Sequence, residues 1–236
     1  MCKTAYRWFP LLIGATALSM IGSLYLVFVY APTEQMMGFV QRIFYFHVPA
    51  AWVGFLAFGV AFIAAMTFLV RRELGWDMLQ IASVEIGILF STMALVSGSL
   101  WARPVWNTWW TWDPRLTTTL VMWLYYVSTL LLRRIVEGEE RRARFAAMLN
   151  VIGFINVPLV FLAIRLWRTI HPVLFTTQGF AMETSMLLTL AASLLAFTLL
   201  FACLLVIRMR LERLNNEIGR LKQSLTMLAN EQRGVP

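Results

Sequence analysis

The sequence predicts an all-α, polytopic membrane protein with six transmembrane helices, from its composition, its apolar stretches and the placement of its basic residues. Of the 236 residues, 60% are hydrophobic and only 14% are charged, and the mean hydropathy is +0.71. A soluble domain carries about a quarter charged residues, so this composition indicates a chain that lies in lipid. The two cysteines, Cys2 and Cys203, form no CxxC motif and give no sign of a disulfide or a thiol redox role.

Six stretches approach the roughly 20 apolar residues that a membrane-spanning helix needs. These predicted spans cover residues 10–30, 47–70, 81–102, 116–132, 146–167 and 184–207. The first is too long for the apolar core of a signal peptide, so we expect it to be retained. Residues 1–207 would then form one membrane domain, followed by a helical cytoplasmic tail at residues 208–236.

The distribution of basic residues predicts that both termini are cytoplasmic. With the N-terminus inside, fifteen Lys and Arg residues fall on the cytoplasmic side and five on the outer side. The five outer ones are Arg42, Arg103, Arg115, Arg165 and Arg168. The outer segments, residues 31–47, 101–115 and 168–183, then contain both histidines of the chain, His47 and His171.

The first outer segment is expected to form a short amphipathic helix that lies on the membrane surface. Apolar residues recur there at helical spacing together with the histidine: Met36, Val40, Ile43, Phe44 and His47. His47 would stand where the second span begins, either as a ligand or as a histidine hydrogen-bonded among loop groups.

The second outer segment is unusually rich in tryptophan. It holds five of the ten in the chain, namely Trp101, Trp106, Trp109, Trp110 and Trp112. An aromatic belt at the membrane interface explains this density poorly, because a single connection needs only one or two anchors. The Asp113-Pro114 pair that follows predicts a helix N-cap with proline in the first turn.

In the third outer segment, His171 precedes Pro172, which prevents a helix from continuing smoothly. His171 is therefore expected at the top of the fifth span, facing the outer loop. Lower in that span, Asn156 and Pro158 predict a kink.

The outer segments together offer two imidazoles, several indoles and a few arginines. Two neutral imidazoles can take both axial positions of a haem iron, whereas a zinc site usually needs more ligands. Indoles would stack on the porphyrin, and the candidates to pair with its propionates are Arg42, Arg103, Arg115 and Arg168. The residue types thus predict a haem site on the outer face.

The run from Trp106 to Thr117, WNTWWTWDPRLT, resembles the tryptophan-rich WWD signature of haem-handling membrane proteins. Its Arg-Leu-Thr ending, the block from Arg42 to Trp52 and the stretch Thr169 to His171 resemble the haem exporter protein C family (CcmC) of cytochrome c maturation. The chain departs from that family at Ala102 and Asn107, where glycine is usual.

This resemblance implies that the protein is a haem carrier of the bacterial inner membrane, with haem b as its cargo on the periplasmic face. His47 and His171 would be the axial ligands, and Trp101, Trp106, Trp109, Trp110, Trp112 and Asp113 the platform. The haem would pass to a membrane-anchored haem chaperone, CcmE, which attaches it covalently.

The resemblance also implies that the protein works beside the ABC transporter subunits CcmA and CcmB and the small helper CcmD, surrounded by membrane lipid and without nucleic acid. The sequence contains no nucleotide-binding motif, so any ATP hydrolysis would come from a partner. Whether such a carrier counts as an enzyme depends on definition, because the covalent attachment occurs on another protein.

Two other functions fit the sequence. One is a membrane electron carrier that holds haem between two histidines, although such carriers usually place ligands within facing spans. The other is a transporter or scaffold subunit without a cofactor, whose tryptophans form only an aromatic collar.

Two further features stand apart from the haem site. Glu85 lies one turn inside the third span, where it is expected to reach the membrane interface. The tail carries Ile207, Leu211, Leu214, Ile218, Leu221, Leu225 and Leu228 at alternating spacings of four and three. This pattern predicts either a coiled-coil seam that docks a partner helix or another copy, or an amphipathic helix on anionic lipid.

Overall fold

The computed structural model describes residues 3–167, 169, 171, 175–176, 179–180 and 182–232. Its elements are α1 (Lys3–Tyr25), a π-helical turn (Leu26–Tyr30), a 3-10 helix (Phe39–Ile43), α2 (Phe44–Arg71), α3 (Leu74–Trp106), α4 (Pro114–Ile135), α5 (Glu139–Gly153), α6 (Asn156–Leu166), β1 (Phe175–Thr176), β2 (Gly179–Phe180) and α7 (Thr184–Gln232). The helices dominate and the two short strands form only a small antiparallel pair, so the all-α prediction is confirmed.

Each of the six predicted spans coincides with a helix or a pair of consecutive helices, the fifth extending one residue beyond the end of α6. Within the described part of the chain, five segments are long and apolar enough to cross a bilayer: residues 7–30, 39–71, 74–106, 139–166 and 184–229. The fourth predicted span lies in α4, which also carries Thr117 to Thr119, Ser128 and Thr129 along its length. These hydroxyl residues lower its hydropathy, so its membrane crossing stays a prediction.

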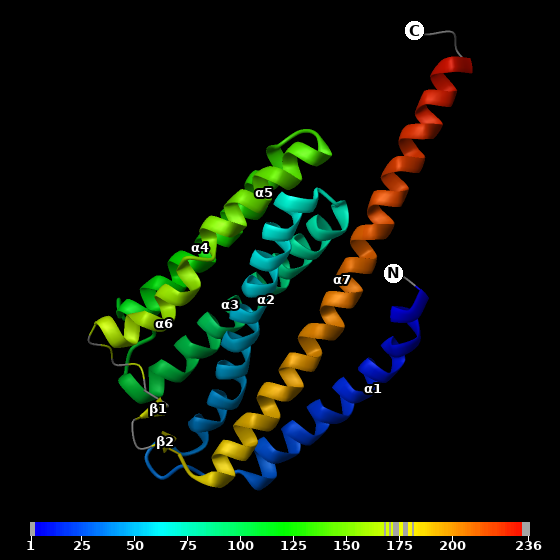
Figure 1. Cartoon of the computed structure of the whole chain (residues 1–236). Coiled ribbons are helices and arrows are strands. Elements are labelled where there is room, and N and C mark those ends of the chain that lie inside the picture. Colours follow the sequence, from blue (N-terminus) through cyan, green and yellow to red (C-terminus); the bar gives the residue numbers. More distant parts are fainter. Residues whose placement is uncertain are drawn as a thin grey trace.

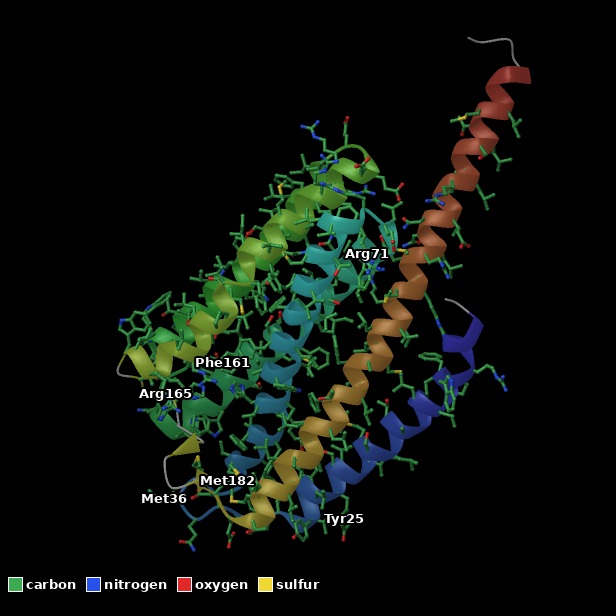
Figure 2. All side chains as sticks on the ribbon, viewed as in Figure 1. Tyr25, Met36, Arg71, Phe161, Arg165 and Met182 are labelled. Carbon is green, nitrogen blue, oxygen red and sulfur yellow. The ribbon has the colours of Figure 1, made fainter. Side chains whose placement is uncertain are left out.

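The long helices run in alternate directions, which gives the bundle two distinct ends (Figure 1). One end gathers residues 31–43, the α3–α4 connection and the β1–β2 pair, and we call it the histidine end. Figure 2 shows Arg71 at the opposite end from Met36, Met182 and Arg165. Phe9 of α1 packs against Arg210 of α7 with 3.9 Å between the guanidinium carbon and the ring centroid. The start of α1 therefore lies beside the beginning of the tail, residues 208–236.

The centre of the bundle is the antiparallel pair α2 and α3. Small residues allow the two backbones to approach closely, as is common between helices in membranes. A Cβ at Gly54 would lie 3.4 Å from the Ser91 backbone, and one at Gly87 would lie 2.5 Å from the Phe58 ring. Phe58 in turn stacks on Tyr126 of α4 at 3.7 Å between centroids, so α4 is fixed to the same core.

A buried polar network joins α3, α4 and α5 at the end away from the histidines. Arg133 donates to both carboxylate oxygens of Asp77, at 2.7 and 2.5 Å. Gln80 donates to Asp77 at 2.7 Å and accepts from Asn150 at 2.9 Å. Arg133 is one of the fifteen basic residues counted on the cytoplasmic side, and its side chain is only 8% exposed and pairs within the bundle.

Glu85 has an ion-pair partner that the sequence did not reveal, and its position at the membrane interface stays a prediction. Its carboxylate accepts two hydrogen bonds from Arg208 of α7, one of them at 2.9 Å from Nη2. Arg208 donates as well to Glu212, at 2.9 Å. This ion-pair cluster fastens α7 to α3 at the point where the tail leaves the bundle.

The first outer segment is only partly helical. Residues 34–38 form a turn in which Glu34 accepts from the amide of Met36 at 2.8 Å and from that of Met37, and Gly38 has a φ of +59°. A left-handed residue cannot continue an α-helix, so the expected amphipathic helix shrinks to the 3-10 turn Phe39–Ile43. This turn leads directly into α2.

The kink predicted in the fifth span is confirmed as a break between α5 and α6 at Phe154 and Ile155. Asn156 donates to the carbonyl of Gly153 at 3.1 Å across this break. The helical tail is confirmed too, because α7 continues without interruption from Thr184 to Gln232.

We expect Arg133→Met to destabilise the protein by about 3–5 kcal/mol, because the buried Asp77 carboxylate would lose its bidentate partner. Arg144→Met is the matched control, since it breaks an exposed pair with Glu140 that contributes about 0.5 kcal/mol or less. Denaturant unfolding in detergent measures both. The double variant Asp77→Leu/Arg133→Met should regain most of the loss, and an Arg133→Met protein as stable as Arg144→Met would contradict the assignment.

Candidate functional site

His47 lies in the first turn of α2, against the inner face of α3. Its Nδ1 atom is 3.0 Å from the carbonyl oxygen of Ala94 and 3.1 Å from the hydroxyl of Ser97. A carbonyl only accepts, so Nδ1 carries the proton and donates to Ala94. The lone pair of the neutral ring is then on Nε2, which is the state that binds metals. The partners of His47 thus belong to a helix and not to loop groups.

Gly98 explains how the imidazole comes so close to α3. A Cβ at position 98 would lie 3.0 Å from Cε1 of His47 and 3.4 Å from its Nδ1. Contacts at 3.0 Å are tighter than almost all Cβ contacts, so a larger residue at 98 would push the ring away from Ala94. Sequence reasoning missed Gly98, Ala94 and Ser97, because only the pairing of α2 with α3 reveals them.

His171 lies beside His47, although it follows α6 and is far from His47 in the sequence. The two ring centroids are 6.3 Å apart and the ring planes differ by 31°. Helix α6 ends at Leu166, and the backbone amide of His171 donates to the hydroxyl of Thr169 at 3.0 Å. The structure therefore brings together the only two histidines of the sequence at one end of the bundle.

The predicted cap of α4 is confirmed. The Asp113 carboxylate accepts from the backbone amide of Arg115 at 2.9 Å, and Pro114 occupies the first helical position. The half-buried Arg115 guanidinium lies within electrostatic range of both Asp113 and His47. The cap therefore holds a cation close to the histidine pair.

The tryptophans form two edge-to-face pairs and one single ring rather than a continuous wall. Trp101 and Trp106 meet at 4.9 Å between centroids, and Trp110 and Trp112 at 5.9 Å. Trp109 lies under the Arg103 guanidinium at 6.0 Å. Trp112 is 76% exposed, so the outermost ring offers most of its surface to a partner or to lipid.

Several polar atoms of this segment are buried without a hydrogen-bond partner in the described part of the chain. They are Nε1 of Trp101, Nε1 of Trp110, Oγ1 of Thr111 and Oγ1 of Thr117. A buried donor or acceptor without a partner costs about 1–3 kcal/mol. Each such atom needs an explanation, and a functional role is one of them.

The two departures from the family pattern have different consequences. Asn107 ends α3 with a φ of +55°, in the left-handed region that glycine usually fills and that asparagine also tolerates. Its carbonyl and its side-chain oxygen both accept from Arg103, at 2.8 and 2.6 Å. Ala102 is buried at 2% exposure, so its methyl group packs inside the bundle.

A groove of about 440 Å³ lies on the far side of α3 from His47. Its lining residues are Leu95, Val96, Ser99, Leu100, Trp109, Trp110 and Leu120. At about 100° per residue, positions 95, 96, 99 and 100 face away from positions 94, 97 and 98. Arg103 shares the groove side of α3, so it is turned away from the histidine pair.

The remaining candidate arginines differ in position. Arg42, in the 3-10 turn, packs its guanidinium against the rings of Phe39 at 5.0 Å and Phe28 at 5.8 Å. Its Nε is buried without a partner among the residues that the structure describes. Arg168 lies outside the described residues.

The described residues contain no group of three or more His, Cys, Asp or Glu that could hold a metal ion. The pair His47 and His171 is smaller than such a group. Two imidazoles suit an ion whose other positions are already filled, as in a metalloporphyrin.

Comparison with known proteins identifies the family of this chain. The family model described as Heme exporter protein C matches residues 1–224. The similar proteins include several bacterial ones named Heme exporter protein C. The one from Bradyrhizobium diazoefficiens is 36% identical over 92% of this chain and 82% of its own length. The one from Escherichia coli K12 is 34% identical over 78% and 74%. The one from Rhodobacter capsulatus is 28% identical over 94% and 93%. A match of this extent assigns the chain to the Heme exporter protein C family of cytochrome c biogenesis.

Proposed function

We propose that this protein binds haem as cargo between His47 and His171 and delivers it to a membrane-anchored haem chaperone during maturation of c-type cytochromes. The observation that carries the proposal is the pair of imidazoles 6.3 Å apart at the end of a helical bundle that also holds the tryptophan segment. Membership of the Heme exporter protein C family supports haem as the cargo.

The distance between the imidazoles supports shared ligation of one iron. Two imidazoles that bind one metal ion from opposite sides, each through a nitrogen about 2 Å away, have ring centres about 6 Å apart. The separation in this protein is 6.3 Å. Since Nδ1 of His47 donates to Ala94, its Nε2 is the atom available to the iron. Haem supplies the iron with four porphyrin nitrogens and leaves its two axial positions to these residues.

The surrounding residues would hold the porphyrin itself. Arg115, within electrostatic range of His47, is the best placed of the candidate arginines to pair with a propionate. The unpartnered indole N–H group of Trp101 would supply a further hydrogen bond. Arg103 faces the groove on the other side of α3 and donates to the carbonyl of Asn107 at the end of that helix. We therefore propose that it stabilises this connection and does not pair with a propionate.

We further propose that α4 completes six membrane spans, that both termini are cytoplasmic and that the histidine end faces the periplasm of a bacterial inner membrane. The support is the alternate direction of the helices (Figure 1) and the concentration of basic residues at the end opposite the histidines. Haem would then be bound on the side where c-type cytochromes are assembled.

The position of the site at one end suits transfer to another protein. The exposed Trp112 and the β1–β2 pair lie at this end and would form the surface that meets the chaperone CcmE. CcmA and CcmB would supply the energy of ATP hydrolysis, and CcmD would assist assembly. A carrier of electrons across the membrane would instead need a second site at another depth, and both histidines of this chain are at one end.

Purified protein that is expressed with ample haem should show a Soret band that depends on both histidines. His47→Ala and His171→Ala should each weaken haem affinity on the order of tenfold or more, because each removes one axial ligand. Absorption titration in detergent measures this, with an unchanged thermal unfolding midpoint as the check on folding. Unchanged spectra for both single variants would exclude these ligands.

Gly98→Ala and Gly98→Val should weaken haem binding progressively, because the added carbons push His47 away from the Ala94 carbonyl. For the valine variant we expect a loss on the order of tenfold, as for other residues that orient a metal ligand. Gly75→Ala is the matched control on the same helix, where a Cβ would meet nothing within 4 Å. Equal haem affinity in Gly98→Val and Gly75→Ala would contradict the role of the His47–α3 contact.

Arg115→Gln should lower affinity for haem far more than affinity for iron protoporphyrin dimethyl ester, whose carboxylates are blocked. A charged hydrogen bond contributes about 1.5–3 kcal/mol, so we expect roughly a tenfold loss for haem. Arg103→Gln should leave both affinities nearly unchanged. If Arg115→Gln lowers both affinities equally, the propionate assignment fails.

A further inference from the structure

Helix α7 continues well beyond the bundle, and its free part carries an uncovered apolar seam. The seam residues beyond the Glu85–Arg208 cluster are Leu211, Leu214, Ile218, Leu221, Leu225 and Leu228. Each of them is at least 50% exposed, so no described residue covers this face. The opposite face carries the polar residue Asn216. An amphipathic helix of this kind usually hides its seam against a partner.

The direction and charge of the tail argue against a position on the membrane surface. Helix α7 projects straight out of the bundle and does not turn to lie across its end (Figure 1). Between residues 211 and 232 the sequence has three basic and three acidic residues, so anionic headgroups would not attract it strongly. The two basic residues just before this part, Arg208 and Arg210, are already engaged, Arg208 by Glu85 and Glu212 and Arg210 by the Phe9 ring.

The helix also needs a partner for its own stability. Gly219 lies in the middle of the free part, with open space around it. A glycine inside a helix costs about 1 kcal/mol relative to alanine, and short isolated helices are marginal in water. Association along the seam would offset this cost.

We propose that the seam pairs with the same seam of a second copy of this chain, as a parallel two-stranded coiled coil. Copies inserted in one membrane with one orientation project their tails to the same side, so only a parallel pair can form. In that register Leu211, Ile218 and Leu225 take the a positions, and Leu214, Leu221 and Leu228 take the d positions.

Charge complementarity supports this partner. Glu217 then takes a g position and Lys222 the e position of the following heptad. These are the positions that face each other between the two strands of a parallel coiled coil. In a two-fold symmetric dimer this ion pair forms twice, with Glu217 of each copy opposite Lys222 of the other. Confinement to one membrane raises the effective concentration of the two tails.

Disulfide trapping of the full-length protein in membranes tests the proposal, in a background where Cys2 and Cys203 are replaced by serine. Leu221→Cys places a thiol on the seam, and Asn216→Cys places one on the opposite face. Upon mild oxidation, Leu221→Cys should give several-fold more disulfide-linked dimer than Asn216→Cys. Two differently tagged copies, co-expressed, identify the product as a dimer of this chain.

A charge swap then tests the register. Glu217→Lys should reduce the Leu221→Cys dimer, and the combination of Glu217→Lys with Lys222→Glu should restore it. Linkage of Leu221→Cys to a different polypeptide, equal trapping at positions 216 and 221, or no trapping at 221 or at Leu214→Cys would each overturn the proposal. Haem binding is measured on the same samples, and its presence or absence does not affect this outcome.

Discussion

The hydrogen bond from His47 to the carbonyl of Ala94 is the contact on which the rest of the candidate site depends. It fixes the proton on Nδ1, leaves the lone pair on Nε2 and holds the ring against Gly98, where an added Cβ would lie only 3.0 Å from the imidazole. The contact requires the close approach of α2 and α3, which the small residues Gly54 and Gly87 permit. Close packing in the middle of the bundle therefore sets the geometry at its end.

Helix α3 connects the features that lie far apart in the molecule. At one end Asp77 and Gln80 bind α4 and α5, and Glu85 binds α7. At the other end Ala94 and Gly98 receive His47, and the helix finishes in the tryptophan segment. Polar contacts buried between helices specify one arrangement, because their loss leaves unpaired charges in an apolar surrounding. The contacts of Asp77, Gln80 and Glu85 at the opposite end of α3 therefore help to fix the position of the helix that receives His47.

Much of this was predictable from the sequence, because its signals are local. Apolar length located the helices, Asp113-Pro114 identified the cap of α4, and Pro158 indicated the break between α5 and α6. The rarity of histidine pointed to His47 and His171. The missed features depend on pairing between helices: no spacing reveals that Arg133 meets Asp77 or that Arg103 faces away from His47. The first outer segment was misjudged because helical spacing outweighed Gly38, which imposes a left-handed turn.

The presence of only two histidines allows the central claim to be tested directly, because labelled histidine would mark these two residues alone. Protein produced with ¹⁵N-histidine and loaded with ferric haem can be measured by pulsed electron–nuclear double resonance, which counts the histidine nitrogens bound to the iron. The proposed site predicts two such nitrogens, one from His47 and one from His171. A haem complex with one labelled nitrogen, or with none, would contradict shared ligation by this pair.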